Sequence, residues 1–451
     1  MEFPQVILTL SLALGIAVVL YSWKNPLNLI PLFILFLGGV FGQVDLGERL
    51  YIQLFEGVRL HLRDFVIMIM LVHVIRRPHA FVQRKQTAFG HAISLFLLYL
   101  LANLCIKLIF FGAEFDSKIS PFIRLFSTFA IYYLIVGYLR SDNFIPFIRS
   151  CYVLCIASVL ILLGYVLLLI PIPEGFKVGF FPSAEGGSQA VRFGMPNHFF
   201  LFFPYFMAIA PLIGYVDKTR PLERLIIILM IVGSALALFR MYLFVVVFGG
   251  VAAFVGGRGR VIRKFVVGTA VAIGLFFVVQ MISEAKGSEI TESFIRRFST
   301  TSDEFANEEG SAGGRVVRTY AAFGQLTEPS VLLLGAAFTR EFSEVLDFAT
   351  SDLGVISTVM YYGLPGLVLI VFIYKRGITV ALASVKRKDA LGHSAGALLL
   401  FLIAVFPGTL FMYNPLESEM FIAVWATFLG AFDALYAESM ALNKRDTSAA
   451  V

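Results

Sequence analysis

The sequence predicts an all-α, polytopic membrane protein. Hydrophobic residues make up 59% of the 451-residue chain and charged residues only 15%, whereas soluble domains are roughly 45–50% apolar and about 25% charged. The apolar residues also fall into runs near the ~20 residues that a helix needs to cross the hydrocarbon core. Basic residues gather between alternate runs, as the positive-inside rule predicts for a multi-pass protein.

About 12–13 apolar segments qualify as membrane spans. We expect them at 4–22, 26–41, 62–75, 89–111, 120–139, 145–170, 197–214, 225–239, 241–257, 265–282, 353–374, 391–411 and 418–436. The first lacks a basic leader and a small-residue cleavage site, which predicts a retained span rather than a signal peptide. The whole chain, 1–451, is interpreted as a single integral membrane domain.

Basic clusters predict which loops face the cytoplasm. They follow the third, seventh, ninth and eleventh spans and recur near the end of the chain, at Arg76, Arg77, Arg84 and Lys85, at Lys218, Arg220 and Arg224, at Arg258, Arg260, Arg263 and Lys264, at Lys375, Arg376, Lys386, Arg387 and Lys388, and at Lys444 and Arg445. The N-terminus and the loops 171–196 and 283–350 then lie outside. Loop 283–350 is large and acidic, with six Lys/Arg against eleven Asp/Glu.

This loop pattern accounts for the net charge of +6, so the excess of basic residues predicts membrane topology and not nucleic-acid binding. No Walker, Rossmann or paired Cys/His metal pattern occurs, which argues against ATP-driven chemistry and predicts neither a cofactor nor a metal. The three cysteines, Cys105, Cys151 and Cys155, stand inside apolar runs and are interpreted as small buried hydrophobes.

Two arginines stand out in the acidic outer loop. In "EEGSAGGRVVRTYAAFGQL", Ser311 can cap a short helix, and Arg315 and Arg318 then share one helix face at i and i+3. A helix N-terminus followed by two guanidinium groups suits a phosphate. The alternative is that both arginines only pair with neighbouring acids such as Glu308 and Glu309.

Two further arginines lie at the expected outer rim. Arg240 interrupts the apolar run "SALALFRMYLFVVVFGG", where a buried charge is costly, and Arg192 closes the loop 171–196 in "SQAVRFGMPNHFF". Each has a simpler interpretation, Arg240 as an arginine snorkelling to the interface and Arg192 as an interfacial anchor. Lys107 and Arg124, also near outer span ends, add positive field there or serve as anchors.

An acidic residue begins the eleventh span. Asp352 opens "SDLGVISTVMYYGLPGL", about three turns before Gly363 and Gly366. Its position fits a helix N-cap. The same position places a carboxylate at the outer rim, where it can act on a substrate.

With these residues in view, the chain resembles the O-antigen polymerase and ligase superfamily of bacterial envelopes. Three landmarks between about 185 and 370 carry the resemblance: Arg240 in "LFRMYLF", the segment "GGRVVRTYAAFGQL" followed by "LLLGAAF" with Gly335, and "SDLGVISTVMYYGLPGL". Arg192 also matches a family tendency. Asp352 falls where the ligases usually carry a histidine, which favours a polymerase over a ligase.

The resemblance implies an inner-membrane glycosyltransferase that takes undecaprenyl-diphosphate-linked oligosaccharide and extends it at the periplasmic face. Arg192, Arg240, Arg315 and Arg318 would bind the diphosphate, Arg240 also acting in catalysis, and Asp352 would act near the acceptor hydroxyl. Implied protein partners are a chain-length regulator and a flippase. A ligase that transfers glycan to lipid A core, a lipid or polysaccharide transporter and a structural membrane subunit are the alternatives.

Overall fold

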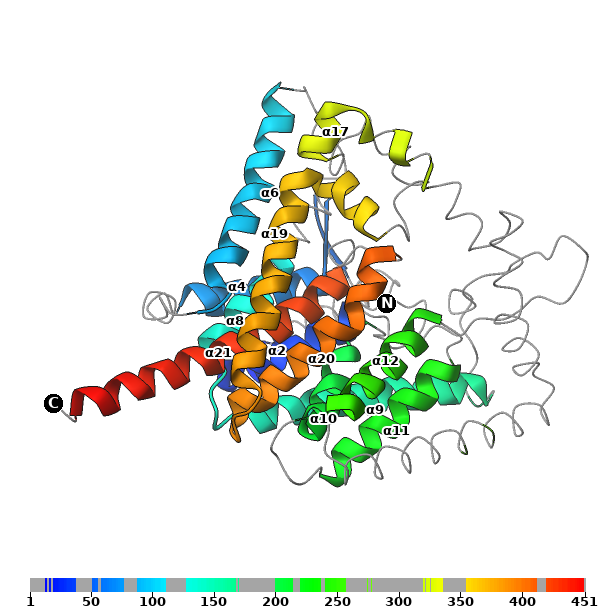
Figure 1. Cartoon of the computed structure of the whole chain (residues 1–451), viewed down its shortest axis with the longest axis vertical. Helices are drawn as coiled ribbons and strands as arrows, with labels where there is room; N and C mark the ends of the chain where they lie inside the picture. Colours follow the sequence, from blue (N-terminus) through cyan, green and yellow to red (C-terminus); the bar gives the residue numbers. More distant parts are fainter. Residues whose placement is uncertain are drawn as a thin grey trace, which may run out of the picture.

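The computed structural model of the chain is a bundle of helices (Figure 1). Besides a few isolated positions, the structure describes residues 19–37, 51–55, 58–76, 87–110, 127–167, 199–213, 220–236, 240–256, 326–335, 354–411 and 419–449. The expected span 265–282, the outer loop 171–196 and most of the outer loop 283–350 lie outside these residues.

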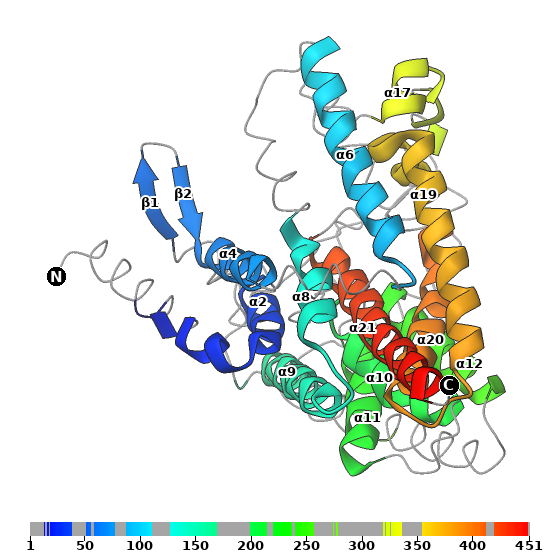
Figure 2. The same ribbon diagram turned by 90° about the vertical axis from the view of Figure 1, so that its left-hand side faces the viewer.

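Apart from α17, which no expected span covers, the described helices lie within or near the expected spans. They are η1 (Pro26–Asn28), α2 (Leu29–Leu37), α4 (Leu62–Ile75), α6 (Gly90–Phe110), α8 (Ala130–Tyr138), α9 (Phe144–Val166), α10 (Phe202–Ile213), α11 (Pro221–Leu236), α12 (Arg240–Gly256), α17 (Pro329–Leu334), α19 (Val355–Ser384), α20 (Ala390–Phe411) and α21 (Glu419–Ala449). An antiparallel hairpin of β1 (Tyr51–Phe55) and β2 (Val58–His61), which the sequence analysis did not identify, precedes α4 (Figure 2).

Within the described residues, four helices are long and apolar enough to cross a membrane, and these confirm a membrane protein. They cover Gly90–Phe110, Phe144–Gly164, Val355–Ser384 and Met420–Asn443. Shorter apolar helices at Pro26–Leu35, Phe202–Ile213, Leu243–Val255 and Ala390–Phe406 accompany them.

Two helices are longer than the expected spans. α19 continues from the expected end at 374 to Ser384, and α21 continues from 436 to Ala449. In α19 the apolar run stops at Lys375 and Arg376, both of which are exposed. Lysine and arginine are good helix formers, so a charge ends an apolar run without ending the helix.

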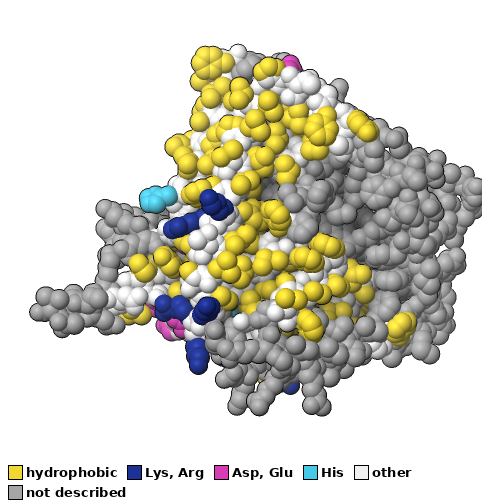
Figure 3. All heavy atoms as spheres, in the orientation of Figure 1, with side chains coloured by type: hydrophobic (Ala, Val, Ile, Leu, Met, Phe, Trp, Pro, Cys, Tyr) yellow, Lys and Arg dark blue, Asp and Glu magenta, His cyan; other side chains and the backbone are white. Residues whose placement is uncertain are grey.

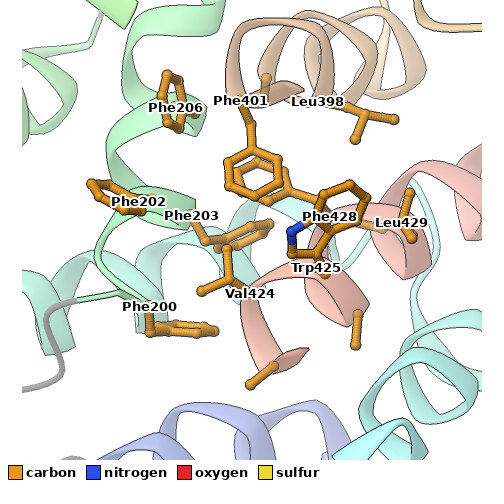
Figure 4. Close-up of a cluster of buried hydrophobic side chains, with 14 of the residues drawn as sticks. Phe200, Phe202, Phe203, Phe206, Leu398, Phe401, Val424, Trp425, Phe428 and Leu429 are labelled. Atoms are coloured by element: carbon orange, nitrogen blue, oxygen red, sulfur yellow. The ribbon is translucent and has the colours of Figure 1, made fainter. Parts of the chain in front are cut away.

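The core is built around α10, which is buried on all sides from Phe202 to Leu212. A helix that is apolar all round belongs in the interior of a large protein or membrane bundle. Its phenylalanines meet aromatic side chains of α20 and α21 (Figure 4). The ring centroids of Phe203 and Phe428 are 4.9 Å apart, and those of Phe401 and Phe428 are 4.3 Å apart and stacked.

A buried carboxylate joins the last long helix to the start of α6. Asp433 of α21 accepts hydrogen bonds from the backbone N–H groups of Ala88 (2.7 Å) and Phe89 (2.9 Å) and from the hydroxyl of Tyr132 (2.6 Å). The first N–H groups of a helix have no partner inside the helix. Asp433 therefore caps α6 from a distant part of the chain.

The outer surface of the bundle is apolar where α6 and α19 run side by side. Leu95, Leu98 and Leu101 on α6, and Val368 and Phe372 on α19, are all exposed. Hydrophobic side chains cover much of the described surface on the face shown in Figure 3. So large an apolar area suits contact with lipid rather than water.

Side chains from the ends of three expected spans meet at one place. The Arg76 guanidinium lies 4.5 Å from the ring centroid of Trp23. The ring of His73 makes edge contacts with Trp23 and with Tyr138 of α8. Alternating spans require these three chain segments to end on the same side of the bundle, and their contact fits that requirement.

Candidate functional site where α6, α17 and α19 meet

The structure describes chain segments next to the predicted site residues, but few of those residues themselves. Arg240 is the first residue of α12, and only its backbone is described. Arg192, Arg315, Arg318 and Asp352 lie outside the described residues. The described segments on either side of these positions define the candidate site.

Two of the three landmarks are in direct contact, because α17 packs across the first part of α19 at a pair of glycines. Gly335 ends α17 with a φ of 69°, and Gly363 lies within α19 with a φ of 68°. A Cβ atom at Gly335 would approach the carbonyl oxygen of Tyr361 closer than 3.0 Å, and one at Gly363 would approach that of Leu333 equally closely. Both the positive φ and the close backbone approach require glycine.

Gly363 also breaks α19. Its φ and ψ are not helical, so two helical pieces meet there. Pro365, two residues later, has no N–H to donate to the carbonyl of Tyr361. At the same break, the Tyr99 hydroxyl of α6 donates a hydrogen bond to the carbonyl oxygen of the next residue, Tyr362. Gly366 makes room for this contact, since a Cβ there would touch the ring of Tyr99 and the Cβ of Tyr362.

A polar stripe on α6 continues from this break along the helix. Tyr99, Asn103 and Lys107 follow one another at intervals of four residues and therefore share one face. The Asn103 side-chain amide donates to the Tyr99 oxygen (3.1 Å) and to the carbonyl oxygen of Leu334 at the end of α17 (2.6 Å). Asn103 and Lys107 are both buried, with 6% and 4% of their surface exposed. The stripe ties α6 to both glycine-bearing segments.

A small apolar cluster holds α17 against α19. Ala322, Val331 and Met360 are buried together, with Leu326 and Ile356 packed beside them. This cluster is separate from the main core. Loop 283–350 therefore contributes a short ordered helix, α17, to the end of the bundle, and Figure 1 shows α17 next to the ends of α6 and α19.

The start of α19 corrects one interpretation of Asp352. The N-cap residue is Gly354, with a φ of 58°, and no side chain among the described residues caps the helix. Asp352 precedes the cap by two residues, so the expectation that Asp352 itself is the N-cap is wrong. Only glycine adopts this backbone conformation readily. At the N-cap position, where aspartate or serine is common, Gly354 therefore supplies a turn of the backbone and not a capping side chain.

The third landmark lies elsewhere in the bundle. α12, which begins at Arg240, packs against α10, α11 and α20. The Tyr205 hydroxyl of α10 donates to the carbonyl oxygen of Val246 in α12 at 2.6 Å. Figure 1 shows α12 well apart from α17. The structure thus brings the Gly335 and Gly363 landmarks together and leaves the helix of the Arg240 landmark apart from them.

Sequence reasoning missed Tyr99 and Asn103, and it placed Lys107 only as an outer-end residue. The available signal was the spacing of three polar groups along one face of an otherwise apolar helix. Among the described residues, no group of three or more His, Cys, Asp or Glu side chains is arranged to hold a metal ion. The described part of the site consists of the Tyr99 hydroxyl, the Asn103 amide and the buried Lys107 side chain on one face of α6.

A comparison with protein-family models finds no match for the chain, and a comparison with curated proteins finds none either.

Proposed function

We propose that this protein is an inner-membrane glycosyltransferase that polymerises undecaprenyl-diphosphate-linked oligosaccharide repeats into O-antigen or exopolysaccharide at the periplasmic face. The observation that carries the proposal is the crossing of α17 and α19 at Gly335 and Gly363. It joins two segments that both belong to the resemblance. The proposal includes about 12–13 spans and a periplasmic position for loop 283–350.

The proposed glycosyl transfer needs a base for the acceptor hydroxyl and cations that bind the leaving diphosphate. The acceptor hydroxyl oxygen forms a bond to the anomeric carbon, the bond from that carbon to the diphosphate oxygen breaks, and the hydroxyl proton passes to Asp352. Arg192, Arg240, Arg315 and Arg318 bind the diphosphate and compensate its growing charge as it leaves. The sugar–diphosphate bond supplies the energy, so the reaction needs no nucleotide.

The place of the reaction follows from its substrate. The carrier lipid stays in the bilayer, and its diphosphate lies at the membrane rim, close to the ends of the spans. In this proposal the headgroup enters beside α17, which packs near the ends of α6 and α19. A flippase that delivers the lipid-linked repeat and a chain-length regulator are the protein partners that this reaction calls for.

A deletion strain tests the proposal against its nearest rivals. Loss of a polymerase leaves one repeat unit per lipid on a gel of surface glycan, or removes the exopolysaccharide. Loss of a ligase leaves no glycan on the lipid A core while full-length glycan accumulates on the carrier. Loss of a transporter leaves lipid-linked repeats on the cytoplasmic side. Unchanged surface glycan of every kind would contradict the proposal.

Purified protein gives the direct test. The protein, reconstituted in lipid nanodiscs with lipid-linked repeats from its own host, should release undecaprenyl diphosphate and form longer glycans without added nucleotide. Aspartate at 352, in place of the histidine usual in ligases, favours this reaction over transfer to lipid A core. Products that appear only when lipid A core is supplied would reverse that preference.

A further inference from the structure

α17 is a short apolar helix within a loop whose sequence is acidic overall. Its residues, Pro329–Leu334, read PSVLLL and carry no charge. Val331 is buried against α19, whereas Leu333 has 56% of its surface exposed. Glu328, immediately before the helix, is exposed and charged. The helix therefore has a polar start and an apolar end, and these two ends suit different surroundings.

The contact with α6 shows how far along that helix α17 ends. α6 has 21 residues, which makes it about 31 Å long and matches the ~30 Å thickness of the hydrocarbon core. Lipid reaches its last turn, because Ile109 and Phe110 are apolar and have 73% and 76% of their surface exposed. Asn103, which donates to the carbonyl oxygen of Leu334 at 2.6 Å, lies seven residues, about 10 Å, before Phe110. The end of α17 is therefore about 10 Å inside the apolar end of α6.

α19, which is also long enough to cross the membrane, gives a similar depth. Gly335 ends α17 and passes the backbone of α19 at Gly363. Gly363 lies eight residues, about 12 Å, after Val355 at the start of α19. Figures 1 and 2 both show α17 near the last turns of α6 and the first piece of α19. Two membrane helices thus place the end of α17 within the apolar layer rather than above it.

Backbone inside a hydrocarbon layer needs partners for its polar groups. At the end of α17, the N–H group of Gly335 donates to the carbonyl oxygen of Val331 at 2.8 Å. The carbonyl of Leu334 belongs to the last turn, where the helix itself supplies no donor. The side-chain amide of Asn103 supplies one. This bond also accounts for a polar residue in an otherwise apolar stretch of α6.

We propose that α17 is a re-entrant helix, which enters the lipid leaflet around the last turns of α6 at Glu328 and ends inside that leaflet at Gly335. Lipid is the partner of its exposed face, because Leu333 continues the apolar surface of α6 and α19 (Figure 3). The six residues of α17 cover about 9 Å, close to the depth that α6 indicates. The inference does not depend on the proposed glycosyltransferase activity, and tests of either leave the other open.

Spin labels measure this depth in the full-length protein. Cys105, Cys151 and Cys155 are replaced by alanine, and one introduced cysteine is labelled in phosphatidylcholine nanodiscs. Power-saturation EPR compares collisions with oxygen, which concentrates in the bilayer, and collisions with a water-soluble nickel chelate. The logarithm of the oxygen-to-nickel ratio should be positive for Leu333→Cys and negative for Glu328→Cys, at the other end of the same helix.

Two exposed positions outside α17 calibrate the measurement. Leu98→Cys, on the apolar surface of α6, should give the value for lipid, and Lys386→Cys, between α19 and α20, the value for water. Negative logarithms at both positions of α17 would place the whole helix in water and overturn the inference. A label on Leu333→Cys that meets neither reagent would mean that protein covers this face, which would overturn it as well.

The same label tests the bond from Asn103. Asn103→Leu leaves the carbonyl of Leu334 without this donor inside an apolar layer, so the end of α17 should move toward water. The logarithm for Leu333→Cys should then fall, while that for Leu98→Cys in the same background stays unchanged and shows that α6 is intact. An unchanged logarithm for Leu333→Cys would overturn the assignment of Asn103 as the residue that pairs α17 inside the leaflet.

Discussion

Gly335 and Gly363 are the residues on which the shape of the candidate site depends most directly. Each has a positive φ, and each lies where the other segment's backbone passes. Substitution at such a position adds two costs, one for the backbone conformation and one for the collision. Neither cost can be relieved by a side-chain movement, because the colliding atoms belong to the backbone.

Gly363→Ala should therefore lower the free energy of unfolding by more than about 2 kcal/mol, visible as a lower melting temperature in detergent. Gly137→Ala is the control, since Gly137 lies in α8 and nothing is within 4 Å of a Cβ there. Alanine favours helix over glycine by roughly 0.5–1 kcal/mol, so the control should melt at the same temperature or higher. Equal melting temperatures for the two variants would contradict the crossing.

Arg240→Ala should abolish glycan assembly while the protein still reaches the membrane. The expectation rests on the cost of a charge inside an apolar run, which binding of an anion would offset. Arg240→Lys should recover little, because a point charge does not replace the planar fork of a guanidinium. The check is surface glycan in a complemented deletion strain, with immunoblotting of the membrane fraction. Normal surface glycan in a strain that carries Arg240→Ala would contradict a role in catalysis and favour an arginine that only snorkels to the membrane interface.

Asp352→Asn tests the proposed base. Because Gly354 is the N-cap of α19, neither Asp352→Asn nor Asp352→Ala should change stability through capping. Loss of a general base typically lowers a rate about a hundred- to ten-thousand-fold. The asparagine variant should therefore melt and bind lipid-linked substrate normally and fail to extend it. If Asp352→Asn extends glycan at a near-normal rate, Asp352 is not the base. Catalysis would then depend on stabilisation of the leaving diphosphate by the arginines.

The sequence predicts the importance of some of these residues and not of others. Arg240 and Asp352 attract attention because charge is rare in apolar runs, so their importance is readable from composition alone. Asn103 is different, since its meaning depends on a carbonyl 231 residues away in the chain. A single polar residue in an apolar helix does not indicate its partner.

At the scale of elements, hydropathy predicted the helices well and their ends less well. The run from 353 to 374 matched the apolar part of α19, but charges at Lys375 and Arg376 do not stop a helix. α17 was missed because its loop is acidic overall. The local signals were present, with Pro329 at the first turn and Gly335 just past the end, the usual asymmetry of helix termini.

The start of α6 yields a prediction of its own. Asp433→Ala would leave the N–H groups of Ala88 and Phe89 and the hydroxyl of Tyr132 without their acceptor. Each buried group left unpaired costs about 1–3 kcal/mol, so a loss of more than about 3 kcal/mol is expected. Glu438→Ala, on the same helix but bonded among the described residues to the exposed Ser141, should cost much less. Thermal melts of the two variants would decide, and similar losses would argue against the cap.

At the scale of the whole molecule, the proposed orientation can be checked by chemical labelling. With Cys105, Cys151 and Cys155 replaced by alanine, Ser311→Cys in loop 283–350 should react with a membrane-impermeant maleimide in intact spheroplasts. Lys386→Cys, between α19 and α20, should react only after lysis. The opposite pattern would place α17 and the candidate site at the cytoplasmic face, where a periplasmic polymerase cannot work.

The cap on α6 also has a consequence for how the protein is made. Asp433 lies 345 residues after Ala88, and ribosomes add about 5–20 residues per second. Each newly inserted α6 must therefore wait roughly 17–70 s for its acceptor to be synthesised. During that interval the N–H groups of Ala88 and Phe89, just before α6, need water or an insertion factor. If synthesis stops before α21, the early helices are inserted but the N–H groups before α6 never receive their acceptor. We expect such a truncated chain to be a substrate for a membrane protease.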